Sequence, residues 1–186
     1  MRRHLLMLAL ASSAAAGLAA CGDGPTPSPS VGRPAMDPSG EPYPLPTGGQ
    51  IDMPASWTTT PGPAGGPQLV RSVSGQGQIV VWQYQRTEPL PTSRRNLRNT
   101  RRSLRNAITA RDPNFKFTAA LLRRVPQPAV EIAGLGTLAG ARRSIRSLHV
   151  YADGRETVVD CIGPVTDSAA FNTTVCEPVL DSLTLG

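Results

Sequence analysis

The stretch "ARRSIRSLHVYADGRETVVDCI", residues 141–162, decides the fold class. Two segments that we interpret as strands, residues 141–151 and 155–162, flank the dipeptide Asp153-Gly154. Asp-Gly between such segments is a strong signal of a β-hairpin, because a two-residue turn needs positive φ at both central positions. The stretch therefore predicts two neighbouring antiparallel strands.

The segments before this hairpin extend the same antiparallel pattern. Residues 115–125 and 129–133 have the composition of strands. We interpret the glycine-rich residues 134–140, "GLGTLAG", as a turn, since they open no helix after a strand and so do not form a phosphate-binding loop.

A second hairpin lies earlier in the chain. Residues 69–74 and 79–86 are joined by "GQGQ". In the second of these segments Trp82 and Tyr84 alternate with Val81, which predicts that the two aromatic side chains share one face of the sheet. Before the hairpin, residues 49–57 predict a short strand, and residues 58–68, "TTTPGPAGGPQ", predict a loop.

The clearest helix covers residues 93–111. Its apolar positions form one stripe at helical spacing: Leu97, Leu104, Ala107 and Ile108. Thr92 or Ser93 provides the N-cap, and Asp112-Pro113 ends the helix, because the residue before proline avoids the helical region. The remaining flank carries six arginines, Arg94, Arg95, Arg98, Arg101, Arg102 and Arg105.

Residues 168–185 predict a second helix, broken or kinked at Pro178. Taken together, the segments predict an α+β domain, in which an antiparallel sheet is packed against the arginine-rich helix and this C-terminal helix.

The first twenty residues have the form of an export signal. A basic start, an apolar middle and a small-residue end occupy residues 1–20. The apolar stretch is shorter than the roughly 20 residues that span a bilayer. A permanent transmembrane anchor remains the alternative.

Leu18-Ala19-Ala20-Cys21 ends this signal and resembles the lipobox of bacterial lipoproteins. The resemblance implies cleavage after Ala20, acylation of the Cys21 thiol and a lipid anchor on the extracytoplasmic face of the cell membrane. Residues 22–47 contain eight prolines and no apolar run, which predicts a linker. Residues 48–186 are long enough for one domain.

The two remaining cysteines are Cys161 and Cys176. Exported proteins meet an oxidising environment, so these cysteines predict a disulfide, with two buried free thiols as the alternative. They have no spacing typical of a zinc site, and we expect no metal ion and no cofactor.

Positive charge is concentrated in one third of the chain. Residues 71–124 carry a net charge of +10, whereas residues 21–70 and residues 125–186 each carry −3. Export argues against nucleic acid as the partner. Anionic lipid headgroups and acidic wall polymers are the candidate partners, and no protein partner is indicated.

The order of elements resembles the PsbP-like fold, in particular the LpqN-type lipoproteins of actinobacteria. The resemblance rests on "IDMPASW" at residues 51–57, on "VLDSL" at residues 179–183 and on the lipobox before them. It implies a tethered, non-enzymatic binding or accessory module and supplies no catalytic residues.

No residues indicate a catalytic mechanism. His149 is the single histidine beyond the signal segment, no nucleophile elbow or zinc-protease motif is present, and nothing in the sequence brings Glu131 and Asp160 together as a carboxylate pair. We therefore expect no enzyme.

Two hypotheses of function follow. In the first, the six arginines of the helix bind anionic surfaces, although a merely solvated face remains open. In the second, a crevice near Trp57 and Trp82 carries or senses an apolar small molecule.

Overall fold

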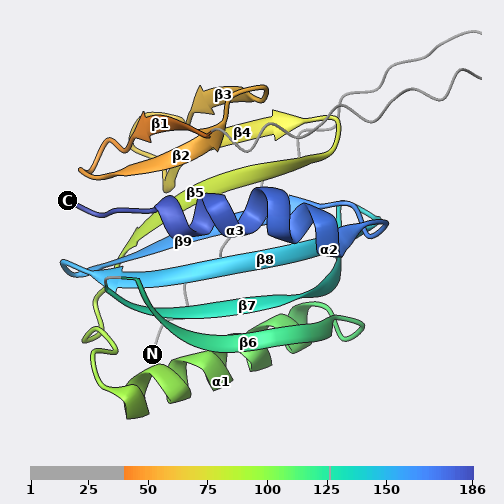
Figure 1. Cartoon of the computed structure of the whole chain (residues 1–186). Coiled ribbons are helices and arrows are strands. Elements are labelled where there is room, and N and C mark those ends of the chain that lie inside the picture. Colours follow the sequence, from red (N-terminus) through yellow and green to blue (C-terminus); the bar gives the residue numbers. More distant parts are fainter. Residues whose placement is uncertain (1–39, 126) are drawn as a thin grey trace, which may run out of the picture. The chain divides into compact units, whose positions relative to one another are not determined.

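A seven-stranded antiparallel sheet forms the centre of the domain in the computed structural model, which describes residues 40–125 and 127–186 (Figure 1). The α+β fold predicted from the sequence is therefore confirmed. In spatial order the strands are β3 (Thr58–Pro61), β4 (Gln68–Ser74), β5 (Gly77–Gln85), β9 (Arg155–Gly163), β8 (Ala141–Ala152), β7 (Gln127–Leu138) and β6 (Lys116–Val125).

Both predicted hairpins are present. Strands β8 and β9 pair around Asp153 and Gly154, whose φ angles of 50° and 73° are the positive values that the short turn requires. Strands β4 and β5 pair from Ser74 and Gly77 outward. These two hairpins are adjacent in the sheet, because β5 pairs with β9.

Helix α1 (Arg94–Arg111) carries the chain from β5 in the middle of the sheet to β6 at its edge (Figure 1). Ser93 is its N-cap, as predicted, and the Ser93 hydroxyl accepts a hydrogen bond from the backbone N–H of Asn96 at 3.1 Å. Leu97 is buried and Leu104 and Ile108 pack beside it. Ala107 is exposed, so the predicted stripe is narrower than expected.

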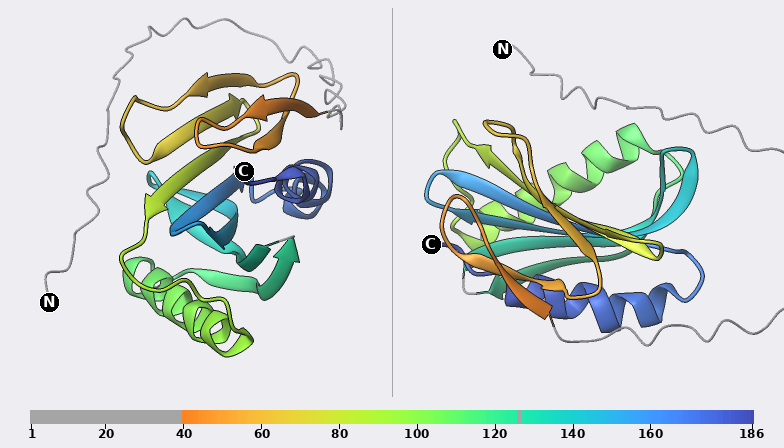
Figure 2. Two further views of the ribbon diagram at one scale, coloured as in Figure 1. Left: turned by 90° about the vertical axis from the view of Figure 1, so that its left-hand side faces the viewer. Right: turned by 90° about the horizontal axis from the view of Figure 1, so that it is seen from above.

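The two helical segments lie on opposite faces of the sheet (Figure 2). Helix α1 packs with Val130, Ile132 and Tyr151 on one face. The C-terminal segment consists of α2 (Ser168–Phe171), the π-helix η1 (Asn172–Cys176) and α3 (Glu177–Ser182). It covers the larger core on the other face, where Phe171, Val175 and Leu180 pack against residues of β5, β8 and β9.

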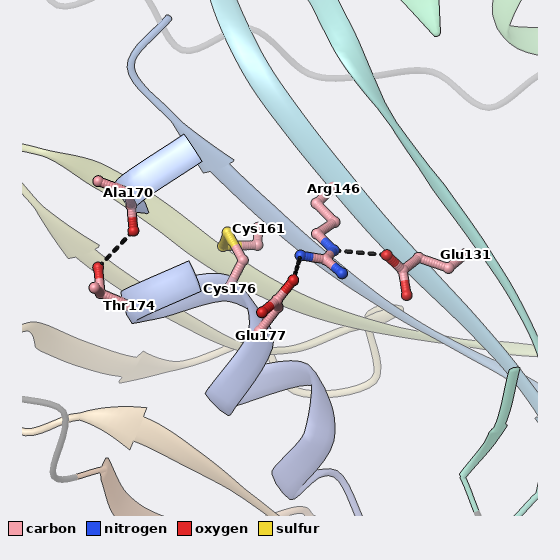
Figure 3. Close-up of a disulfide and its surroundings, with 7 residues drawn as sticks. All are labelled: Glu131, Arg146, Cys161, Ala170, Thr174, Cys176 and Glu177. Carbon is pink, nitrogen blue, oxygen red and sulfur yellow. Dashed lines mark hydrogen bonds and ion pairs between the residues drawn. A yellow bond between two sulfur atoms is a disulfide. The ribbon is translucent and has the colours of Figure 1, made fainter. Parts of the chain in front are cut away.

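The C-terminal segment is helical, as predicted, and irregular just before Pro178. The backbone N–H of Glu177 donates to the carbonyl of Asn172 at the end of η1. Pro178 has no N–H with which to continue a helical series, so a new helix, α3, begins here. The predicted disulfide joins Cys176 at this point to Cys161 of β9 (Figure 3).

Two predictions of loops are wrong in part, although residues 62–67 and the turn at residues 139–140 are as expected. Residues 58–61 form β3, a short strand at the edge of the sheet. Pro61 has no backbone N–H, and an edge strand tolerates this because only one of its sides is paired. Gly134 and Gly136 lie within β7 rather than in a turn. A Cβ atom at Gly134 would lie 2.3 Å from the Phe115 ring, so close packing explains these glycines.

The predicted boundary between linker and domain is also wrong. Residues 40–47 belong to the fold: β1 (Gly40–Pro44) pairs with β2 (Gln50–Pro54) in a separate two-stranded sheet, and Leu45 lies in the main core. The prolines of residues 40–47 indicated a linker, but β1 pairs with a strand on one side only and therefore tolerates proline. Cys21, the predicted signal and the rest of the predicted linker lie outside the described residues.

Candidate functional site

A groove of about 510 Å³ lies between the first half of α1 and the second half of β6. Its lining consists of arginine and leucine side chains alone: Arg94, Leu97, Arg98, Arg101, Leu121, Leu122 and Arg123. We call this feature the α1–β6 groove. It combines cations with apolar surface, a combination suited to a ligand that is itself amphipathic.

The α1 side of the groove follows from helical spacing. Arg94, Arg98 and Arg101 recur at intervals of four and three residues, so they lie along one flank of the helix. Leu97, beside them, is buried and anchors this part of α1 to the sheet.

The β6 side of the groove follows from the position of β6 at the edge of the sheet. Leu122 lies opposite Val130 and faces α1, whereas Leu121 lies opposite Glu131 and belongs to the other face. Because no strand covers the outer edge of β6, side chains from both faces reach the groove. Leu121 remains 50% exposed.

The structure divides the six arginines predicted as one binding face. Arg101 donates to the carbonyl of Ala120 at 3.2 Å, and the guanidinium of Arg105 lies 4.6 Å from the centre of the Phe117 ring. Arg102 donates to Asn99 on its own helix. Arg101 and Arg105 therefore fasten α1 to β6, which is a role that sequence reasoning missed.

The other three arginines, Arg94, Arg95 and Arg98, are exposed, and they form no hydrogen bond or ion pair with any residue in the described part of the chain. They occupy the start of α1, whose first turn contains no acidic residue. The N-terminus of a helix carries partial positive charge, and cations there cost about 0.3–1 kcal/mol each when exposed. An anion bound beside Arg94 and Arg98 would relieve this repulsion.

Arg123 lines the groove but already has acidic partners. It forms ion pairs with Glu131, at 3.0 Å, and with Asp181 of α3. Glu131 is buried and also accepts from Arg146, which in turn donates to Glu177 at 2.8 Å (Figure 3). This network joins the C-terminal segment to the sheet, so the unpaired cations of the groove are Arg94 and Arg98.

A polar cluster occupies the α1 face of the sheet away from the helix. Ser147 Oγ lies 3.4 Å from His149 Nε2, and His149 Nδ1 lies 2.9 Å from Glu156 Oε1. A serine, a histidine and a carboxylate in this order resemble a nucleophilic triad. The Ser147 hydroxyl, however, donates its proton to Asp160, which leaves none for His149 to accept. The cluster is therefore a structural network.

Nothing in the sequence brought Glu131 and Asp160 together as a carboxylate pair, and the structure also keeps them apart. Glu131 and Asp160 lie on opposite faces of the sheet, since Glu131 faces the C-terminal segment and Asp160 pairs in register with Ser147. They form no carboxylate pair. In the part of the chain that is described, no group of three or more His, Cys, Asp or Glu side chains is arranged to hold a metal ion.

Trp57 and Trp82 do not line one crevice. Trp57 packs in the main core, with its ring centroid 6.3 Å from that of Phe171. Trp82 lies on the opposite face, where its indole N–H donates to Asp160 at 3.0 Å. The apolar site predicted between them is therefore absent, and the α1–β6 groove is the candidate site instead.

Comparison with known proteins supports the fold. The cyanobacterial PsbP protein (CyanoP) of Synechocystis sp. PCC 6803 superposes with a TM-score of 0.59 at 12% identity, over 87% of this chain and 100% of that protein. LpqN of Mycobacterium tuberculosis, described as involved in cell envelope biogenesis, gives a TM-score of 0.51 at 16% identity, over 83% and 87% of the two chains. The expected PsbP-like fold is confirmed; at these identities the likeness shows the fold alone.

No protein-family profile matches the sequence, and no curated protein matches it. Among the helices of residues 40–125 and 127–186, none combines the length and the apolar character needed to cross a bilayer.

Proposed function

We propose that this protein is a non-enzymatic binding module, anchored by an acylated Cys21 to the extracytoplasmic face of the cell membrane, that binds anionic partners at the start of α1. The observation that carries the proposal is the group of unpaired, exposed cations Arg94, Arg95 and Arg98 beside the α1–β6 groove. Anionic lipid headgroups and acidic wall polymers are the partners that such a group would meet outside the membrane.

The tether strengthens weak contacts. A lipid anchor at Cys21 would keep the domain close to the membrane. The start of α1 would then meet its anionic partner at a high effective concentration. Each exposed arginine near an anionic surface adds about 1 kcal/mol. Three unpaired arginines therefore give weak binding by themselves, measurable at low salt, and the tether strengthens it.

The test uses the unacylated chain, residues 21–186 with Cys21→Ser. It should sediment with vesicles that contain phosphatidylglycerol, should not sediment with vesicles of phosphatidylcholine alone, and should dissociate as salt approaches physiological strength, where screening acts over about 8 Å. The triple variant Arg94→Gln/Arg95→Gln/Arg98→Gln should lose this binding.

The matched control removes the same charge elsewhere. Arg71→Gln/Arg111→Gln/Arg143→Gln alters three exposed arginines away from the groove and should leave binding nearly unchanged. Failure of the parent chain to bind anionic vesicles at low salt would refute the proposal, and so would equal loss in the two triple variants.

A further inference from the structure

We propose that the α1–β6 groove binds one anionic amphiphile with a single acyl chain. The phosphate or carboxylate head of this lipid pairs with Arg94 and Arg98, and its chain covers Leu121 and Leu122 beside the buried Leu97. This inference rests on the proposed function, because it names the ligand that the same site selects. The proposed function needs only an anionic surface that contacts α1, whereas this inference requires a single molecule that enters the groove.

The apolar floor of the groove argues for an acyl chain. A purely electrostatic site needs no leucines, yet Leu97 of α1 and the adjacent Leu121 and Leu122 of the edge strand β6 all line the groove. Leu121 is half exposed and is one of two large apolar side chains left exposed in the described part of the chain. Covering it with a hydrocarbon chain removes apolar surface from water.

The dimensions argue for one chain. The volume of about 510 Å³ lies within the range of about 300–1,000 Å³ that is typical of small-molecule sites. The groove is bounded by one helix and one edge strand, which Arg101 joins by donating to the carbonyl of Ala120.

The charges argue for an anionic head and place it. Arg101 is committed to Ala120, and Arg123 is committed to Glu131 and Asp181. Arg94 and Arg98 are the two lining cations without a partner in the described residues. The head therefore lies at the start of α1, where the helix dipole also favours negative charge.

The experiment compares two lipids that differ only in the head. The probes are 1-myristoyl-lysophosphatidic acid and 1-myristoyl-lysophosphatidylcholine, each kept monomeric, with inorganic phosphate as the head alone. Calorimetric titration of the unacylated chain should show saturable binding of one molecule of the phosphatidic acid, weaker binding of the choline lipid by about tenfold, and no measurable binding of phosphate.

Two pairs of variants separate the groove from net charge and from apolar exposure. Arg94→Gln/Arg98→Gln should weaken binding of the phosphatidic acid by about tenfold, whereas Arg102→Gln/Arg111→Gln removes equal charge outside the groove lining and should change it by less than about twofold. Leu121→Ser should weaken the binding of both lysolipids, and Leu121→Met should bind both of them as the parent does. Leu121 is a surface residue, so neither substitution threatens folding.

The outcomes distinguish this inference from the proposed function. Binding to anionic vesicles without stoichiometric binding of the lysolipid would overturn the groove ligand and leave the proposed function standing. Equal binding of the two lysolipids would show that the acyl chain alone governs binding. Equal effects of the two arginine pairs would show that net charge alone governs it. Either result would also overturn the groove ligand. Amide shifts on lipid binding should appear at Leu97, Leu121 and Leu122; shifts confined to other elements would contradict the site.

Discussion

Glu156 has the most polar partners on the α1 face of the sheet. It accepts from Arg86 at 2.6 Å, from Tyr151 at 3.2 Å, and lies 2.9 Å from His149 Nδ1. Burial alone would raise the pKa of this carboxyl, but the bonds and charges of His149 and Arg86 outweigh burial and lower the pKa below its ordinary value. Burial and the same carboxylate raise the pKa of Tyr151, so its hydroxyl stays a donor.

The lowered pKa of Glu156 predicts an acid-sensitive part of the stability. A carboxyl whose pKa is lower in the folded than in the unfolded chain stabilises the fold above its unfolded pKa, near 4.5. That stabilisation is lost as the pH falls from there through the folded pKa. Urea unfolding from pH 6 to pH 3 should show this loss in the parent and a smaller loss in Glu156→Gln.

Glu88→Gln is the control for this prediction, since Glu88 is an exposed partner of the same Arg86. Its pH profile should follow that of the parent. A Glu156→Gln profile parallel to the parent's over the whole range would contradict the assignment.

Helix α1 positions both unpaired cations of the α1–β6 groove, Arg94 and Arg98, so its start matters most among the elements. Ser93 caps it through the hydrogen bond from Asn96. Ser93→Ala should lower the free energy of unfolding by about 1 kcal/mol. Chemical denaturation of this variant checks the value. Ser103→Ala, at an exposed interior position of the same helix, should be neutral or slightly stabilising, because alanine is the better helix former.

The disulfide ties the C-terminal segment to β9, the strand at the centre of the larger core. It closes a loop with a sequence separation of 15 residues, for which chain-entropy models give roughly 3 kcal/mol. Reduction should therefore lower the unfolding midpoint of the parent chain. The double variant Cys161→Ala/Cys176→Ala should be less stable and insensitive to reductant. Two alkylatable thiols in native, exported protein would show that the bond does not form in the cell.

The elements that the sequence predicted correctly are those with a long, regular pattern. Helix α1 and the β8–β9 hairpin follow from spacing and from Asp153-Gly154 alone. Strands β1 and β3 were missed because their prolines are typical of loops, and an edge strand tolerates proline where a central one does not. The extent of β7 depends on Phe115 packing over Gly134, a contact that no local pattern reveals.

The candidate site was half predictable for a similar reason. The arginines of α1 are evident from helical periodicity, but the sequence does not show that Arg101 and Arg105 bind β6. Leu121 and Leu122 could be recognised as strand residues. Their place in a groove depends on β6 being the last strand of the sheet, which is a property of the strand order.

At the scale of the whole molecule, the proposed anchor at Cys21 decides where the domain acts. Cys21→Ser should leave either an uncleaved precursor or a soluble secreted chain, since no other cysteine precedes the disulfide pair. Labelling with a fatty-acid analogue and detergent phase separation measure the result. Ser28→Ala, in the predicted linker, should retain label and partition with the detergent. Acylation of the Cys21→Ser chain would exclude the anchor.

The bridge between Gln50 and Thr184 has a consequence for when the domain can fold. Each backbone N–H of the pair donates to the other's carbonyl, at 3.0 and 2.9 Å, across a separation of 134 residues. At a rate of synthesis of about 5–20 residues per second, Thr184 is made roughly 7–27 s after Gln50 of β2. A nascent chain stalled before residue 184 should thus remain sensitive to protease, and translocation machinery that needs an unfolded substrate has that interval in which to engage it.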